Sequence, residues 1–381
     1  MASAARNLLL AASLGLASGA VHCAEWAVAP VFFFNADHES NRTLQEGTPE
    51  SESLGASLDL DLARRTEAGV LSITPHYYMR RLSPQVDADV NDLRVPVALQ
   101  LNFERSALTF GASYADESTL TTELAETGAV RAGSSRIMLA GDAGWRFSQS
   151  DARQLDVSAN YQDVNYTGNN AGQLYDYRYA AFSARENFAI TTRSGWSLGG
   201  FASKLRSEER GSNSAEAGVS VGFDYDWSQN THMAGTLGFS RREFDGVRDQ
   251  GRSGNFSFSH HGEKHEWGLV LDQSLVPYGS GTLTEQDSAE LHLTRHFDSR
   301  LQGIARLSFT RNDDIAYGYD LDARTYRYAD TELRWQLRET WSASIVAGYS
   351  DAQDPGAPER VGGWMLAVRT YWAPNRHVLG P

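Results

Sequence analysis

The 381-residue sequence contains a single cysteine, Cys23. A small exported domain that depends on disulfides needs at least one pair, so a disulfide scaffold is excluded. A lipid-attachment site needs a small residue before the cysteine, but His22 stands there, which argues against a lipid anchor. The stability of the fold must therefore come from another source.

Long apolar runs are also missing. Beyond the N-terminus, no stretch approaches the roughly 18 to 20 consecutive apolar residues of a transmembrane helix, and the mean hydropathy is -0.44. The first residues combine Arg6, an apolar core over residues 8–20 and small residues suited to cleavage. This pattern predicts a secretory signal peptide over residues 1–23 that is removed on export, because the apolar run is too short for an anchor helix.

Basic residues are in the minority. Lysine and arginine number 34 against 48 aspartates and glutamates, which gives a formal net charge of -14. An acidic chain without a basic block is a poor partner for nucleic acid, so we expect none. Helical periodicity sustained over several turns is absent as well, which leaves strands as the main elements.

A two-residue alternation of apolar and polar side chains runs through the remaining sequence. In SLGASLDLDLARR (residues 53–65), leucines 54, 58, 60 and 62 fall on one parity, and Asp59 and Asp61 fall on the other. Residues 93–103, 137–147, 155–161 and 219–227 repeat the pattern. Period two is typical of β-strands with two different faces.

Turn-forming residues divide the chain into about eighteen such strands, with sixteen as the alternative. Their expected starts are residues 25, 52, 67, 91, 106, 135, 153, 174, 194, 214, 231, 252, 265, 287, 300, 323, 341 and 360. Short and long connections alternate, which is typical of a transmembrane antiparallel up-and-down β-barrel with short periplasmic turns and long extracellular loops. We expect the barrel over residues 24–372, a C-terminal extension over 373–381, and a location in the outer membrane of a Gram-negative bacterium. A soluble secreted β-protein is the alternative.

In a barrel of this kind the apolar parity contacts lipid and the polar parity lines the lumen. The candidate lumen-lining residues are Asp59, Asp61, Arg94, Glu104, Arg136, Asp142, Arg146, Asp156, Asp224, Asp226, Glu290, His292, Arg306, Arg334 and Arg338. The two signs of charge nearly balance, which suits water and neutral or mildly charged solutes.

Aromatic residues gather near the expected strand ends, where interfacial girdles lie. An inner girdle is predicted from Trp26, Trp145, Trp196, Trp227, Trp267, Trp335, Trp341 and Trp372, and an outer one from Tyr77, Tyr78, Tyr114, Tyr166, Tyr317 and Tyr319.

The longest expected loop spans residues 116–134 and is the third long one. Its position and acidity resemble those of the inward-folded loop of general porins, so Asp116, Glu117, Glu123 and Glu126 are candidate constriction residues. An ordinary exposed loop is the equal alternative.

No residue set nominates catalysis. The sequence has no nucleophile elbow, paired-carboxylate signature or phosphate-binding loop. The three histidines of HHGEKH (His260, His261 and His265) are best explained as a solvated turn. We expect no enzyme, no cofactor and no metal site.

The whole mature chain resembles the proteobacterial outer-membrane β-barrels associated with exopolysaccharide and exosortase (PEP-CTERM) gene clusters. The resemblance lies in EWAVAPVFFFNADHESNRTL (25–44), SLVPYGSGTL (274–283) and DSAELHLTRHFDSRL (287–301). It implies an outer-membrane protein with a role in polysaccharide export. Many such barrels end on an aromatic residue, whereas here nine residues follow Trp372.

These observations favour a passive conduit for polysaccharide or small polar solutes. The alternatives are a surface-attachment or structural barrel with a plugged lumen and, third, a barrel enzyme. The partners expected from the fold are outer-membrane lipid and the barrel-assembly machinery. The resemblance adds polysaccharide and export-complex proteins.

Overall fold

The computed structural model describes residues 25–83, 89–122, 134–168, 174–313, 324–354, 359–375 and 377–379. The predicted signal peptide lies outside these residues. Within the described ranges, no helix is both long and apolar enough to cross a membrane.

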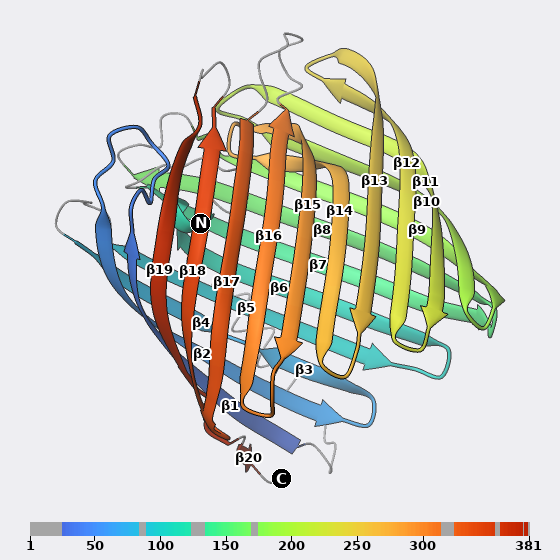
Figure 1. Cartoon of the computed structure of the whole chain (residues 1–381). Coiled ribbons are helices and arrows are strands. Elements are labelled where there is room, and N and C mark those ends of the chain that lie inside the picture. Colours follow the sequence, from blue (N-terminus) through green and yellow to red (C-terminus); the bar gives the residue numbers. More distant parts are fainter. Residues whose placement is uncertain are drawn as a thin grey trace.

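The described chain forms a closed antiparallel β-barrel (Figure 1). Its strands are β1 (Glu25–Glu39), β2 (Ser51–Thr66), β3 (Gly69–Ile73), β4 (His76–Leu82), β5 (Val90–Asn102), β6 (Ser106–Ser118), β7 (Ser134–Ser150), β8 (Arg153–Gly168), β9 (Tyr177–Thr191), β10 (Ser194–Ser207), β11 (Ser212–Ser228), β12 (Thr231–Phe244), β13 (Val247–His261), β14 (His265–Tyr278), β15 (Thr282–His296), β16 (Leu301–Asp313), β17 (Arg324–Arg338), β18 (Trp341–Gln353), β19 (Val361–Trp372) and β20 (His377–Leu379). Apart from β3 with β4 and β19 with β20, neighbours in the chain pair with each other, and β1 pairs with β19 to close the wall. A closed wall leaves no open sheet edge in lipid.

The wall contains eighteen strands, as predicted, because β3 and β4 are two halves of one strand and the three-residue β20 is an addition to the closed wall. Both halves pair with β2 on one side and with β5 on the other. The break falls at residues 74–75, where Pro75 has no amide hydrogen to donate to the ladder. Its carbonyl still accepts a hydrogen bond from the Leu60 amide at 3.0 Å, so the wall stays continuous.

The two parities face opposite environments. Leu54 and Leu58 on β2 are exposed, at 69% and 39%, and Leu58 lies level with Phe32 and Tyr77 of the neighbouring strands. The same outer face carries exposed large apolar side chains on most other strands, among them Phe110, Phe182, Leu198, Leu237, Leu307, Ile345 and Leu366. The opposite face of β2 carries Ser53, Ser57 and Asp59. An apolar exterior around a polar interior is the arrangement that lipid requires.

All but two strands begin within three residues of their predicted starts. The exceptions are β13, expected from residue 252 but beginning at Val247, and β15, expected from 287 but beginning at Thr282. Residues 247–251 and 282–286 are mostly polar and resemble loops in composition, yet they continue the strands. Both exceptions involve the β14–β15 hairpin: β15 is one of its strands, and β13 precedes it.

The tryptophans of the predicted inner girdle lie near the short-turn end, and Trp145, Trp196, Trp227 and Trp335 are exposed. The predicted outer girdle is partly wrong. Tyr78 is level with inward-facing Ser57, and Tyr166 is buried in an internal cluster. Tyr317 and Tyr319 lie outside the described residues.

The predicted C-terminal extension returns to the barrel. β19 ends level with Phe32, so the first residues of β1 extend beyond it. β20 then pairs with β1 over Trp26–Val28. This short strand occupies an edge that would otherwise be open.

Short and long connections lie at opposite ends of the barrel, so the orientation of the barrel in the membrane can be tested. Asp245 and Gly246 join β12 to β13 at the long-loop end, with φ of 47° and 86°, as a type I′ turn requires. Gln229 and Asn230 join β11 to β12 at the opposite end. We expect an epitope inserted at Asp245–Gly246 to be labelled on intact cells and one at Gln229–Asn230 to be labelled only after permeabilisation. The opposite labelling pattern would mean that the barrel is inserted the other way up.

Candidate functional site

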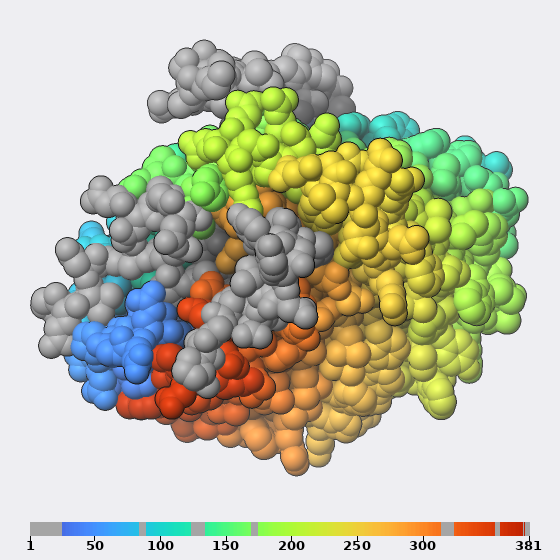
Figure 2. Space-filling model, turned by 90° about the horizontal axis from the view of Figure 1, so that it is seen from above, coloured from blue at the N-terminus to red at the C-terminus, as the bar shows by residue number. Residues whose placement is uncertain are grey.

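The β14–β15 hairpin leaves the barrel wall at its long-loop end. β13 and β14 pair only from His261 and Glu266 to Gly254 and Gln273. β14 nevertheless continues to Tyr278 and stays paired with β15 along its whole length. The far half of the hairpin is therefore separated from β13, and β15 approaches β10 and β11 inside the barrel. In Figure 2, orange atoms lie within the ring of strands beside the yellow-green end of β10 and β11.

The backbone carbonyls at the tip of this hairpin accept hydrogen bonds from the other side of the mouth. The Tyr175 amide donates to the Gly279 carbonyl at 2.8 Å, the Arg210 guanidinium to Ser280 at 2.5 Å, and the Ser212 hydroxyl to Gly281 at 2.6 Å. Gly281 has a φ of +76°, and a Cβ there would lie 3.0 Å from the Ser207 side chain. Glycine is therefore needed both for the turn and for the close approach.

Beside the tip, Asp176 joins the segment before β9 to β8. Its carboxylate accepts a hydrogen bond from the Tyr166 amide at 2.7 Å, and its carbonyl accepts one from the Ser207 hydroxyl at 2.7 Å. Burial raises the pKa of the Asp176 carboxyl, although the Tyr166 amide opposes that shift.

An apolar cluster fills the space between the hairpin and the inner wall. Leu275 and Leu283 come from the hairpin, and Leu283 is fully buried. The other members come from β8, β9, β10, β12 and the segment before β9: Val164, Tyr166, Leu174, Tyr177, Leu205 and Phe244. Burial of leucine-sized groups favours the folded-in position by about 1.5 to 3 kcal/mol each.

A buried ion network holds the base of the hairpin. Arg242 on β12 is 2% exposed, and its guanidinium lies 2.6 Å from Glu285 of the hairpin and 3.4 Å from Glu216 on β11. It also donates to the Arg252 carbonyl at 2.8 Å. A Cβ at Gly251 would overlap the Arg242 guanidinium, so only glycine at this position leaves room for the arginine side chain.

Arg242→Gln is expected to destabilise the folded-in hairpin by about 3 to 5 kcal/mol, because Glu216 and Glu285 would be left buried without their cation. Denaturant titration measures the loss, and channel recordings should show added current fluctuation. The triple variant Arg242→Met, Glu216→Gln and Glu285→Gln removes the buried charges together and should recover most of the stability. If the triple variant is no more stable than Arg242→Gln, the network is not what holds the hairpin.

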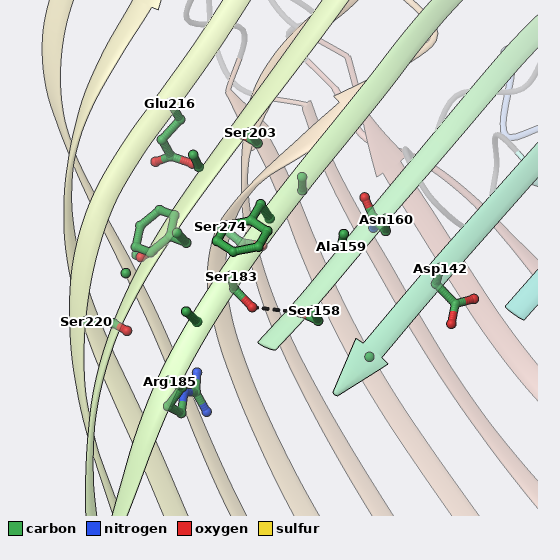
Figure 3. Close-up of a pocket in the computed structure, with 18 of the residues that line it drawn as sticks. Asp142, Ser158, Ala159, Asn160, Ser183, Arg185, Ser203, Glu216, Ser220 and Ser274 are labelled. Carbon is green, nitrogen blue, oxygen red and sulfur yellow. Dashed lines mark hydrogen bonds between the residues drawn. The ribbon is translucent and has the colours of Figure 1, made fainter. Parts of the chain in front are cut away.

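Below the hairpin lies a cavity of about 450 Å³ in the lumen wall. Small apolar residues make up much of its lining, and the most frequent polar groups are hydroxyls, with Ser158, Ser183, Ser203, Ser220, Thr236, Ser253 and Ser274 contributed by seven strands. Asn160, Asp142, Arg185 and Glu216 add an amide and both signs of charge, and Tyr179 and Phe201 add aromatic rings. Figure 3 shows the charged groups arranged around the serines and the 2.7 Å hydrogen bond between Ser158 and Ser183.

A second charged cluster lies on the inner face of β16, β17 and β19. Glu332, whose side chain is 1% exposed, lies 2.9 Å from Arg334, 3.6 Å from Arg306 and 4.0 Å from Arg369. Arg306 also pairs with Asp330 at 2.7 Å. Several arginines around two buried carboxylates leave a net positive strip on this wall.

The structure pairs many of the candidate lumen residues with one another or with near neighbours. Asp59 contacts His76, and Arg146 contacts Asp156 at 3.0 Å. Asp224 and Asp226 both contact His232, and His292 lies 2.8 Å from Thr294. Asp61, Asp142 and Glu290 lie on the inward parity of β2, β7 and β15. Arg338 is the last residue of β17, next to an irregularity in its pairing with β18.

Two candidate positions need correction. Glu104 lies in the short turn between β5 and β6 and not on the lumen wall. Asp116 belongs to β6, where it is level with Leu93 and Ile137 on the lipid-facing parity. The predicted loop therefore begins three residues later, because β6 extends to Ser118.

Glu117 does face inward, but as part of the wall. Its carboxylate lies 2.7 Å from Arg94 and 3.5 Å from Arg136, two other candidate lumen residues. The first residues after β6 form a helical turn in which Thr121 donates to Asp92 at 3.0 Å. Glu123 and Glu126 lie outside the described residues, so the role of this loop as a constriction stays a prediction.

Sequence reasoning missed Arg242, Glu216, Glu285 and Glu332. The signal was available for the hairpin: Glu285 and Asp287 share the parity of lipid-facing Leu291 and Leu293. Carboxylates on a lipid-facing parity are costly in a bilayer, so their presence indicates that this part of β15 does not face lipid, although it stays paired with β16.

Comparison with known proteins agrees with the fold. No protein-family model matches the sequence, and no curated protein matches it either. The structure of OccK2 (OpdF) from Pseudomonas aeruginosa in complex with glucuronate is 13% identical and aligns with a TM-score of 0.51 over 92% of this chain and 98% of that chain. The structure of OccAB1 from Acinetobacter baumannii is 12% identical, with a TM-score of 0.50 over 94% of this chain and 98% of that chain.

The protein is an outer-membrane β-barrel of a Gram-negative bacterium. Its eighteen-stranded wall and its apolar outer face are those of a porin-like barrel. At this level of sequence identity the similarity concerns the fold alone. The solute that the barrel conducts depends on the residues that line its own lumen.

Proposed function

We propose that the protein is a passive channel for small polar solutes. The observation that carries this proposal is the cavity below the β14–β15 hairpin. Among its small apolar residues it presents hydroxyls, one amide and charges of both signs, which suit hydrated solutes with several hydroxyl groups. The hairpin reduces the open cross-section, which favours small solutes over long polymers. We assign no catalytic residue to this lining.

Planar-bilayer recordings of the purified full chain test the proposal. We expect stable single-channel currents, and we expect Ser183→Trp to reduce them because the new side chain would extend into the cavity. Phe188→Trp is the matched control, because Phe188 lies on the lipid-facing parity of the same strand, level with exposed Trp196, and outside the lining of the cavity; it should leave the current unchanged. A folded wild-type protein without conductance would favour the plugged-lumen alternative.

Liposome swelling measures which solutes pass. We expect neutral monosaccharides to enter faster than oligosaccharides of the same composition. Glucuronate, the ligand in the structure of OccK2, is a useful anionic comparison. Equal rates for short and long sugars would contradict a narrow path.

A role in polysaccharide export rests on the family resemblance alone. We retain it as a second proposal, with export-complex proteins and the barrel-assembly machinery as partners. Uptake of long oligosaccharides by liposomes that contain the wild-type protein would favour the polysaccharide-export proposal over the small-solute proposal.

A further inference from the structure

Separation of the hairpin leaves β13 with one free edge. Over Val247–Ser253, β13 pairs with β12 but not with β14. The β12–β13 hairpin projects from the top of the barrel in Figure 1. Part of the free edge is occupied by Arg242, which donates to the Arg252 carbonyl from inside.

Three arginines lie on the outer face of this hairpin, just above the apolar belt. Arg252 is level with Phe239, Arg241 with Gln250, and Arg248 with Glu243. Phe239 and Leu237 on the same face are each 63% exposed. Arg241 is diagonal in the ladder to both other arginines, and same-face diagonal neighbours are about 7 to 8 Å apart.

The positive charge of this cluster is only partly neutralised. Arg248 pairs with Glu243 at 3.0 Å. Across the described ranges, no carboxylate lies within ion-pair distance of Arg241 or Arg252. A chain with a net charge of -14 therefore presents exposed arginines next to its lipid-facing surface.

The cluster borders a surface hollow of about 850 Å³. Its lining includes Phe239, Arg241, Arg248 and Gln250, with Asp249 on the opposite parity. Guanidinium groups bind phosphate oxygens bidentately, and an outward arginine is tolerated at the headgroup level but not deep in hydrocarbon. Cations above exposed apolar side chains match an amphiphile with a phosphorylated head and acyl chains.

We propose that Arg241, Arg248 and Arg252 form a binding site for the phosphate groups of a glycolipid of the outer leaflet, whose acyl chains lie on Phe239 and Leu237. The proposal rests on the orientation with the long loops outside the cell. It is independent of conduction through the lumen, because the cluster faces away from it.

The test is a titration of the purified barrel, in an uncharged detergent, with diphosphorylated lipid A. Dephosphorylated lipid A and inorganic phosphate are the comparison probes, and native mass spectrometry counts the bound molecules. We expect the double variant Arg241→Gln and Arg252→Gln to weaken lipid A binding by roughly tenfold or more. Replacement of both arginines by lysine should give an intermediate loss, since lysine is a point charge without a planar fork.

Arg295→Gln is the matched control, because Arg295 is an exposed arginine on the lipid-facing parity of β15 at the short-turn end, level with His265 and Gly303 and without an arginine beside it. It should bind lipid A as the wild type does. Heat-modifiable migration on gels establishes that each variant is folded. Binding that is unchanged in the double variant, or equal for phosphorylated and dephosphorylated lipid A, would overturn the proposal. Saturation by inorganic phosphate at the same concentrations as lipid A would also overturn it, because the site would then be specific for the anion and not the lipid.

Discussion

Replacing Ser274–Gln286 by a two-residue Asn-Gly turn is expected to raise the single-channel conductance several-fold. Gln273 and Asp287 are directly opposite each other in the β14–β15 ladder, so a type I′ turn can join them without changing the remaining register. The shortened hairpin stays in the wall and no longer crosses the lumen. Because the hairpin removes cross-section from the mouth, its loss should widen the path for ions, as measured in planar bilayers.

A variant that loosens the hairpin without deleting it distinguishes obstruction of the lumen by the hairpin from misfolding of the shortened protein. Leu275→Ala with Leu283→Ala keeps the hairpin but removes its apolar anchor, at a cost of about 2 to 5 kcal/mol per leucine. We expect the mean conductance of this variant to lie between wild type and the shortened hairpin, with more frequent fluctuations. Conductance unchanged in both variants would place the narrowest point elsewhere.

The constriction predicted from the sequence gives the contrasting experiment. Deletion of Thr119–Thr127 should raise conductance if that loop also narrows the path. Changing Glu117, Glu123 and Glu126 to glutamine should lower cation preference, most visibly at low salt. The effect of Glu117 is expected to come through Arg94 and Arg136, which it neutralises in the wall.

The strand positions and the outward or inward direction of each parity followed from period-two alternation, because one face meets lipid and the other meets water. That contrast is strong for residues such as Leu58 and Asp59, and their environments are local properties of the sequence. The inward hairpin does not obey the same rule. Glu285 and Leu283 share a parity, yet both contact protein. Whether each position is polar or apolar therefore depends on the side chain that it contacts, and not on whether its face meets lipid or water.

The buried ion network of Arg242, Glu216 and Glu285 could not be predicted from the sequence, because it too depends on specific partners. Arg242 lies on the inward parity of β12 beside Ser240, which indicates a lumen residue but not its partners. The partner Glu285 lies more than forty residues away and reaches it only because β14 separates from β13. The parity of Glu285 indicates that it does not face lipid, but nothing in either strand alone identifies Arg242 as its partner.

Introducing arginine on alternate faces of one strand should give opposite outcomes. Leu99 on β5 is level with Leu71 and Phe110 on the outer face, whereas its neighbour Gln100 is exposed on the inner face. Leu99→Arg is expected to lower the free energy of unfolding by about 2 to 4 kcal/mol if the site lies near the midplane of the bilayer. Gln100→Arg should change it little, because the new guanidinium would lie in the wet lumen.

Denaturant titration of the refolded barrel in lipid vesicles measures both variants against the same baseline. Leu99→Ala serves as the control for lost apolar contact, so that the excess loss in Leu99→Arg isolates the cost of a charge in hydrocarbon. The difference should shrink when the protein is held in detergent micelles, where water reaches the outer face more easily. Equal destabilisation by arginine at positions 99 and 100 would contradict the assignment of the apolar parity to lipid.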